Sequence, residues 1–204
     1  MKKITLALSI LLAASAHAAN IDNASSLAGG TKITFETTTP GSYTALTLSD
    51  VTFTPGANSA LYVNSDYAGS YNTQGRSLAN TYADNAFTQL TITFNSAVKA
   101  FGFNWGAADS TWTLSAYDAS NTLLGSRSLT ATFSSNAGEF LGLGFATDIA
   151  FATLTGAPSD YVMIDNFTVS AQPVPEPSTY GLVLGGLAIL AIATRRKAAW
   201  FRSA

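Results

Sequence analysis

The sequence predicts an all-β protein whose main part is an antiparallel, jelly-roll-like β-sandwich. Apolar and polar residues alternate with period two in many short segments between 31 and 170, and helical periodicity is lacking there. Turn-forming residues separate these segments, which is typical of a sandwich or jelly roll. An apolar stretch at each end of the chain adds a cleaved N-terminal signal helix and a short C-terminal transmembrane helix to the prediction.

The first 18 residues have the three parts of a signal peptide. Lys2 and Lys3 give a positive start, residues 4–14 are apolar, and Ala16 and Ala18 form a small-x-small cleavage pattern. We therefore expect signal peptidase to release a mature chain that begins at Ala19, with cleavage after Ala16 as an alternative. A buried N-terminal helix is the other interpretation of this segment.

Residues 19–172 are expected to form the β-sandwich domain. In the clearest strand, Leu90, Ile92 and Phe94 alternate with polar residues. Residues 118–121 favour a hairpin turn, and residues 57–86 are expected to be a long, partly ordered surface connection. The expected strands are residues 31–37, 46–54, 90–95, 101–105, 111–117, 122–129, 140–145, 149–155 and 161–170.

Composition excludes several classes of function. Residues 19–172 carry four basic and eleven acidic side chains, a net charge of −7, which disfavours nucleic acid as a partner. The chain has no Cys, and its one histidine, His17, lies in the predicted leader. Ser-His-Asp and Cys-His catalysis, thiolate metal sites and His-ligated zinc are therefore not expected.

The C-terminal segment, residues 173–204, has three distinct parts. Residues 173–179 are a proline-rich linker, residues 180–194 are an apolar run predicted to be a transmembrane segment, and residues 195–204 are a basic tail. The cluster Arg195, Arg196 and Lys197 should stay on the cytoplasmic side, which places the domain across the membrane. An ordinary membrane anchor on a proline-rich stalk is the alternative.

This segment resembles the PEP-CTERM sorting signal in the composition, order and position of its parts. The resemblance implies an exosortase as processing partner, with Pro175, Glu176 and Pro177 as the recognised residues. It also implies a transient stay in the inner membrane and delivery to the cell surface or the extracellular space. Residues 198–204 extend beyond the basic cluster, a departure from many such signals.

Through residues 33–36, 100–106, 114–118 and 164–167, the main domain resembles the β-sandwich domains common among PEP-CTERM proteins. One motif in it suggests a metal. The apolar phase changes around Asp165 and Asn166, which predicts a β-bulge there. By resemblance to carbohydrate-binding jelly rolls, Asp165 would bind a structural calcium with Glu36 as partner. The alternative is an Asp that caps a strand end without a metal.

Aromatic residues supply the candidate ligand site. Tyr67 and Tyr71 in the long connection, and Trp105 and Trp112 beside a turn, could stack on a sugar. The tyrosines could equally belong to a solubilising loop, and the tryptophans to the core.

The leading hypothesis is a non-enzymatic, exported surface or extracellular-matrix protein that is associated with exopolysaccharide or biofilm. The alternative is a carbohydrate-binding module with a Tyr/Trp ligand site. Glycoside hydrolysis by two carboxylates is a third hypothesis, but no pair among the eleven acids can be selected from the sequence.

Overall fold

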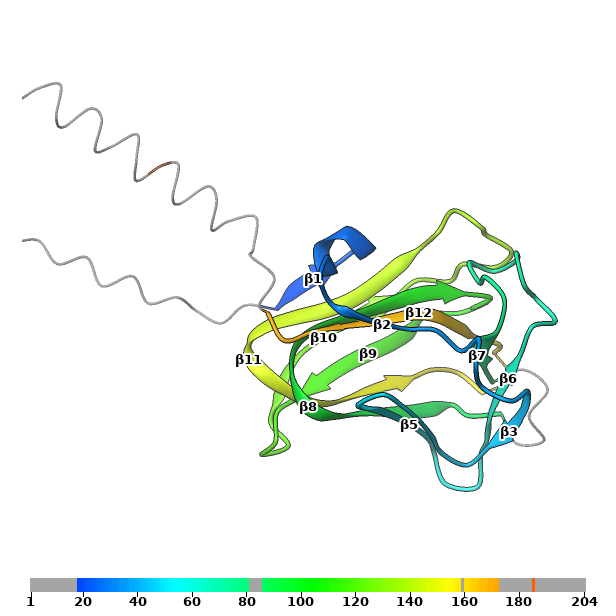
Figure 1. Cartoon of the computed structure of the whole chain (residues 1–204), viewed down its shortest axis with the longest axis horizontal. Coiled ribbons are helices and arrows are strands. Elements are labelled where there is room, and N and C mark those ends of the chain that lie inside the picture. The colour runs from blue at the N-terminus through cyan, green and yellow to red at the C-terminus, as the bar shows by residue number, and fades with distance from the viewer. Residues whose placement is uncertain (1–17, 81–85, 159, 173–184, 186–204) are drawn as a thin grey trace, which may run out of the picture.

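Twelve strands and one short 3₁₀ helix make up the part of the chain that the computed structural model describes, residues 18–80, 86–158, 160–172 and 185. All strand pairs are antiparallel, and together they form two packed layers (Figure 1). The elements are β1 (Ala19–Ile21), η1 (Ala24–Leu27), β2 (Thr31–Ile33), β3 (Gly41–Tyr43), β4 (Leu46–Leu48), β5 (Val51–Pro55), β6 (Leu61–Asn64), β7 (Ser77–Ala79), β8 (Gln89–Gly106), β9 (Trp112–Tyr117), β10 (Leu123–Leu129), β11 (Phe140–Thr155) and β12 (Met163–Ser170).

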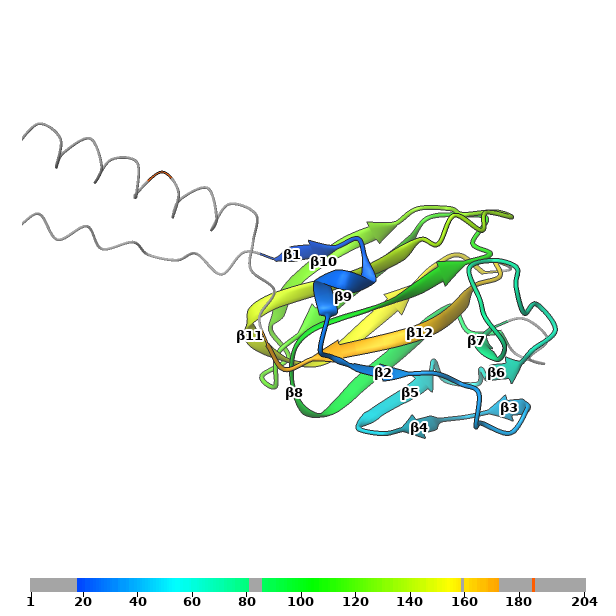
Figure 2. The same cartoon turned by 45° about the horizontal axis from the view of Figure 1, so that its top comes forward.

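The long strands β8 and β11 bend and so belong to both layers (Figure 2). The first part of β8 pairs with β5 and with the end of β11, and the second part pairs with β12 and with the start of β11. The β8–β11 register shifts between Gly144 and Ile149, where both strands turn from one layer to the other. One layer therefore contains β4, β5, β9 and β10, and the other contains β1, β2, β3, β6, β7 and β12.

Phenylalanine rings fill the space between the layers. Phe167 on β12 contacts four other rings, with centroid separations of 5.2 to 6.4 Å. The four partners are Phe53 on β5 and Phe94, Phe101 and Phe103 on the two halves of β8. The Phe167 side chain therefore contacts both layers. Each such buried ring contributes about 1.5–3 kcal/mol of hydrophobic stabilisation. The chain has no Cys, so its stability depends on this packing and not on disulfides.

The all-β antiparallel sandwich predicted from the sequence is confirmed, but several strand boundaries are wrong. Two pairs of expected strands, residues 90–95 with 101–105 and 140–145 with 149–155, are the single strands β8 and β11. The expected strand 46–54 is a hairpin of β4 and β5, because Ser49 adopts a left-handed backbone (φ 52°) and reverses the chain.

The prediction that residues 57–86 form a long surface connection is also wrong, because this range contains β6 and β7. Both strands are buried: Leu61, Val63 and Leu78 have no exposed surface. They extend the layer that contains β12, through the pairs β12–β7 and β7–β6.

Two local predictions are confirmed. The turn after β9 is closed by hydrogen bonds from the Ser120 and Thr122 amides to the Asp118 carboxylate, at 2.9 and 2.8 Å. The β12–β8 register shifts between Asp165 and Thr168, and Asn166 has φ 51°. This is the β-bulge expected from the change of apolar phase.

The ends of the folded part meet at one corner, and most long loops lie at the opposite end (Figures 1 and 2). β1 leaves the sandwich where β12 ends, beside the bends of β8 and β11. We call the other end the loop end; its connections are residues 65–76, 107–111, 130–139 and 156–162. The described residues of these connections carry most of the candidate site.

Candidate functional site

The predicted tyrosine pair is brought together at the loop end. The rings of Tyr67 and Tyr71 meet edge to face, with centroids 5.4 Å apart and planes at 74°. Both side chains are half-buried, in the connection between β6 and β7. Tyr71 has φ 53°, an unusual left-handed conformation for a bulky residue.

The residue after Tyr71 fixes this loop to the sandwich. The Asn72 side-chain amide donates to the Trp105 carbonyl oxygen at 2.8 Å and to Glu139, and its Oδ1 accepts from the Gly138 amide at 2.6 Å. Gly106 lies directly against the Tyr71 carbonyl, which would overlap any Cβ at that position. The tyrosine loop is therefore seated on the end of β8.

The same network favours the ionised form of Glu139. Burial alone would raise the pKa of Glu139, but hydrogen bonds from Ser135, its own backbone amide and Asn72 outweigh burial and lower it. The Ser135 hydroxyl lies 2.6 Å from the carboxylate. A carboxylate stabilised as an anion in this way suits a structural role and not that of a general acid.

The predicted tryptophan platform is contradicted by burial. Trp105 and Trp112 have no exposed surface, and their rings meet each other 6.0 Å apart inside the core. Each indole N–H is satisfied internally, by the Thr130 carbonyl oxygen at 3.1 Å and by Asp160 at 2.7 Å. Because both continue the apolar face of a strand, the core alternative is the one that the structure shows.

Asp160 anchors the loop between β8 and β9, and the sequence did not single it out. Its carboxylate accepts from the Asp109 amide at 2.8 Å, from the amide and hydroxyl of Ser110, and from Trp112. Burial would raise its pKa, but these hydrogen bonds dominate and lower it. No local pattern marks this residue, because its partners lie about fifty positions away in the chain.

The predicted calcium pair, Glu36 and Asp165, is also brought together. The Asp165 carboxylate is fully buried and accepts from the Gln74 and Asn166 amides at 2.7 and 2.6 Å. The Glu36 carboxylate accepts from the Arg76 amide at 3.0 Å, two residues along the same loop. Burial raises the pKa of Asp165, and the nearby Glu36 charge raises it further.

This pair meets part of what calcium requires. Two adjacent carboxylates, one of them buried, create the negative charge that a divalent cation would neutralise. Calcium takes six to eight oxygen ligands, and the described residues contain no group of three or more Asp, Glu, His or Cys side chains that could hold a metal. Backbone or water oxygens would have to supply the remaining ligands.

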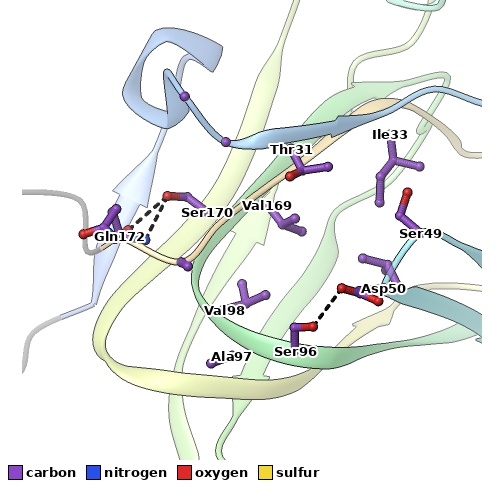
Figure 3. A pocket seen from close by; sticks show the side chains of 14 residues that line it. Thr31, Ile33, Ser49, Asp50, Ser96, Ala97, Val98, Val169, Ser170 and Gln172 are labelled. Atoms are coloured by element: carbon purple, nitrogen blue, oxygen red, sulfur yellow. Dashed lines mark hydrogen bonds between the residues drawn. The ribbon is translucent and has the colours of Figure 1, made fainter.

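A small cavity lies between the layers at the corner where the ends meet (Figure 3). Its volume is about 320 Å³, near the lower limit for ligand pockets. Val51, Val98 and Val169 line it, and its acid, Asp50, already accepts from the Ser96 hydroxyl at 2.8 Å. None of the residues predicted from the sequence to bind a ligand or metal lines this cavity.

The segment that follows the last strand matches a known sorting signal. Residues 173–197 match the family model of the PEP-CTERM protein-sorting motif, and β12 ends at Ser170. The chain carries a PEP-CTERM sorting motif. This motif implies an exported protein that an exosortase processes, as the resemblance predicted. The match contains Pro175, Glu176, Pro177, Arg195, Arg196 and Lys197.

The predicted terminal helices fall outside the described residues. This holds for the signal segment up to residue 17, including Ala16, for the proline-rich motif, and for the apolar run apart from residue 185. Ala18 is exposed and Ala19 begins β1. Among the described residues, no helix has the length and apolar character needed to cross a membrane.

Comparison of this chain with solved structures gives a distant likeness. The K1 cleaved adhesin domain of Lys-gingipain from Porphyromonas gingivalis W83 matches with a TM-score of 0.42 and 14% sequence identity, over 70% of this chain and 98% of the adhesin chain. No curated protein sequence matches this chain.

Proposed function

We propose that this protein is a non-enzymatic surface or extracellular-matrix protein associated with exopolysaccharide or biofilm. The observation that carries the proposal is the PEP-CTERM motif at residues 173–197, which begins directly after the sandwich. The motif explains how the domain leaves the cell, and the acidic, sparsely charged sandwich is what is delivered.

The inventory of side chains supports a non-enzymatic role. The chain has no Cys, and its one histidine, His17, lies in the predicted leader. Asp160 and Glu139 accept several hydrogen bonds each and are held as structural anions. The lowered pKa values disfavour either carboxylate as a general acid.

The proposed maturation has two cleavages. Signal peptidase would cut before Ala19, while the apolar run 180–194 holds the chain in the inner membrane with the cluster 195–197 in the cytoplasm. Exosortase would then recognise Pro175, Glu176 and Pro177 and cleave near them, which releases the sandwich or transfers it to the surface.

Intact mass and cell fractionation in the native host test this maturation. We expect a product that starts near Ala19, ends between residues 173 and 177, and lies outside the inner membrane. The double change Glu176→Ala and Pro177→Ala should leave residues 180–204 attached in the inner membrane, whereas the exposed control Asp109→Asn should be processed normally. Normal processing of the double variant would contradict exosortase recognition of these residues.

A structural calcium is proposed at Glu36 and Asp165 because the fold brings these two carboxylates together. Calcium should raise the melting temperature of the EDTA-treated protein, since a ligand present at 100 times its Kd stabilises by about 2.7 kcal/mol. Glu36→Gln should abolish this response, because Glu36 is exposed and the variant can fold. Equal calcium responses in both proteins would rule the site out.

A carbohydrate-binding role is the second candidate, and the contact between Tyr67 and Tyr71 favours it. Because Trp105 and Trp112 are buried, such a site would depend on the aromatic residues that the loop end exposes.

A further inference from the structure

We infer that the loop end binds a neutral polysaccharide chain through an aromatic surface formed by Tyr71, Phe133 and Tyr161. This inference rests on the proposed association with exopolysaccharide and assigns it a place on the molecule. The three residues come from three different connections, and each connection contacts residues 106–110, at the end of β8 and in the loop that follows it.

Phe133 is presented to solvent by a constrained backbone. Its side chain is 60% exposed, and its φ is 50°, in the left-handed region that is strained for a bulky residue. The amides of Thr132 and Phe133 both donate to the Ala108 carbonyl oxygen at 2.9 Å, which keeps the backbone in this state. An apolar ring fixed outward in this way adds nothing to the core.

Tyr161 is presented by the connection between β11 and β12, which is bound to the same loop through Asp160. Its side chain is 52% exposed, although Asp160 and Val162 on either side are buried. Asp160 holds the amides of Asp109 and Ser110, and the Val162 amide donates to the Asn80 side chain at 2.8 Å. The backbone on both sides of Tyr161 is therefore held by hydrogen bonds of its two neighbours, Asp160 and Val162.

Tyr71 completes the surface. Its carbonyl rests on Gly106, its ring meets Tyr67, and the following residue, Asn72, is tied to β8 and to the β10–β11 connection. Gly106, Ala108 and Asp109 thus each position one of the three aromatic segments. Because the backbone of all three segments is held before a ligand arrives, binding would cost little backbone conformational entropy.

The chemistry around these rings fits a neutral sugar polymer. Aromatic faces suit the apolar C–H faces of sugar rings, and the exposed Asp109, Ser134 and Asn136, in the same connections of the loop end, offer hydrogen-bonding groups. The charge of −7 over residues 19–172 disfavours an acidic polymer. The loop end also faces away from the corner where both ends of the folded part leave, so a tethered molecule would present it outward (Figures 1 and 2).

The test is affinity electrophoresis and calorimetry of the full chain, purified in a mild detergent, against a panel of polysaccharides. The panel contains neutral polymers (dextran, laminarin, mannan and galactomannan) and acidic ones (alginate and polygalacturonate). We expect saturable binding to at least one neutral polymer and a loss of at least tenfold in affinity for the double variant Phe133→Ala, Tyr161→Ala. The matched control is Leu123→Ala, which removes another exposed apolar side chain (53%) on β10 and should bind like the parent.

Several outcomes would overturn the inference. These are no binding to any neutral polymer, preference for the acidic polymers, or equal affinities of the double variant and the parent at unchanged melting temperature. A change of oligomeric state in the double variant without glycan binding would assign the surface to self-association instead. The Glu176→Ala, Pro177→Ala variant should bind as the parent does, so failure of sorting and failure of this surface can be told apart.

Discussion

Asp160 shows how a single buried charge can organise a loop. Four donors converge on its carboxylate, two of them backbone amides of the loop that positions Phe133 and Tyr161. Removing the carboxylate would leave buried donors without partners, and this cost exceeds the net value of the bonds themselves. The stability of the loop end therefore depends on a residue that does not contact the proposed ligand.

Asp160→Ala should lower the free energy of unfolding by about 3 kcal/mol. Because hydrogen bonding lowers the folded pKa of Asp160, its contribution is present above the unfolded pKa of about 3.9 and is lost as the pH falls through the folded value. Urea denaturation between pH 7 and pH 2 measures both effects. The exposed neighbour Asp109→Asn should change stability little, and a similar loss there would refute the assignment.

Asp165 should show the opposite dependence on pH. Burial and the Glu36 charge raise its folded pKa, so its contribution is complete below the unfolded pKa and is lost as the pH rises through the folded value. Glu36→Gln should therefore raise the free energy of unfolding by about 0.5 kcal/mol at pH 7 in EDTA and leave it unchanged at pH 3. Thermal melts at the two pH values check this, and a gain of equal size at both would contradict it.

At the scale of elements, the first strand depends on one arginine. The Arg127 guanidinium on β10 donates to the Ile21 and Gly142 carbonyl oxygens at 2.9 and 3.0 Å and lies 2.7 Å from the Asp22 carboxylate. It thus ties β1 and the chain directly after it to β10 and β11. β1 has three residues and, among the strands that the structure describes, pairs only with β11, so it has few backbone hydrogen bonds.

Arg127→Met should release β1 while leaving the rest of the sandwich folded. We expect faster hydrogen exchange at residues 19–22 and a loss of about 1–2 kcal/mol of global stability. Lys99→Met is the matched control, because Lys99 also bridges a carbonyl and a carboxylate, those of Ala146 and Asp148, but at a more exposed site. Equal exchange at residues 19–22 in both variants would contradict the role of Arg127.

Local elements could be predicted from the sequence because their causes are local. The turn after β9 needs only Asp118 and its next four residues, and the bulge at Asp165 follows from a change of apolar phase along one strand. The continuity of β8 through residues 95–98 could not be predicted, because it depends on pairing with β5, β11 and β12, which are distant in the sequence.

The candidate site was predictable to a smaller extent, for the same reason. Tyr67 and Tyr71 lie four positions apart, and the structure brings their rings together. The burial of Trp105 and Trp112, and the exposure of Phe133 and Tyr161, depend on how four loops pack at one end of the sandwich. An alternating pattern says which residues share a face, but not where a strand enters the core.

At the scale of the whole molecule, the registers place the two ends close together. Ala19 pairs with Gly144, Gly144 with Ala100, and Ala100 with Ser170. Three steps between neighbouring strands, each about 4.8 Å, separate β1 from the end of β12 by about 14 Å.

This closeness predicts that a circular permutant will fold. Joining residue 172 to residue 19 through about eight flexible residues, with new ends in the turn 119–121, should keep the strand content and cost about 1–2 kcal/mol of stability, because the turn bonds of Asp118 are lost. Circular dichroism and thermal melting measure this. New ends inside β8, which pairs in both layers, should abolish folding, and a folded permutant there would contradict the central role of this strand.

The position of β12 determines how the molecule would respond to mechanical force. If the domain is held by the segment after Ser170 and pulled by a polymer at the loop end, tension runs along β12, with β8 on one side and β2 and β7 on the other. The hydrogen bonds between these antiparallel strands lie across the direction of pull, so they share the load and must break together. The same strand that buries Phe167 between the layers would then make the domain resistant to shear.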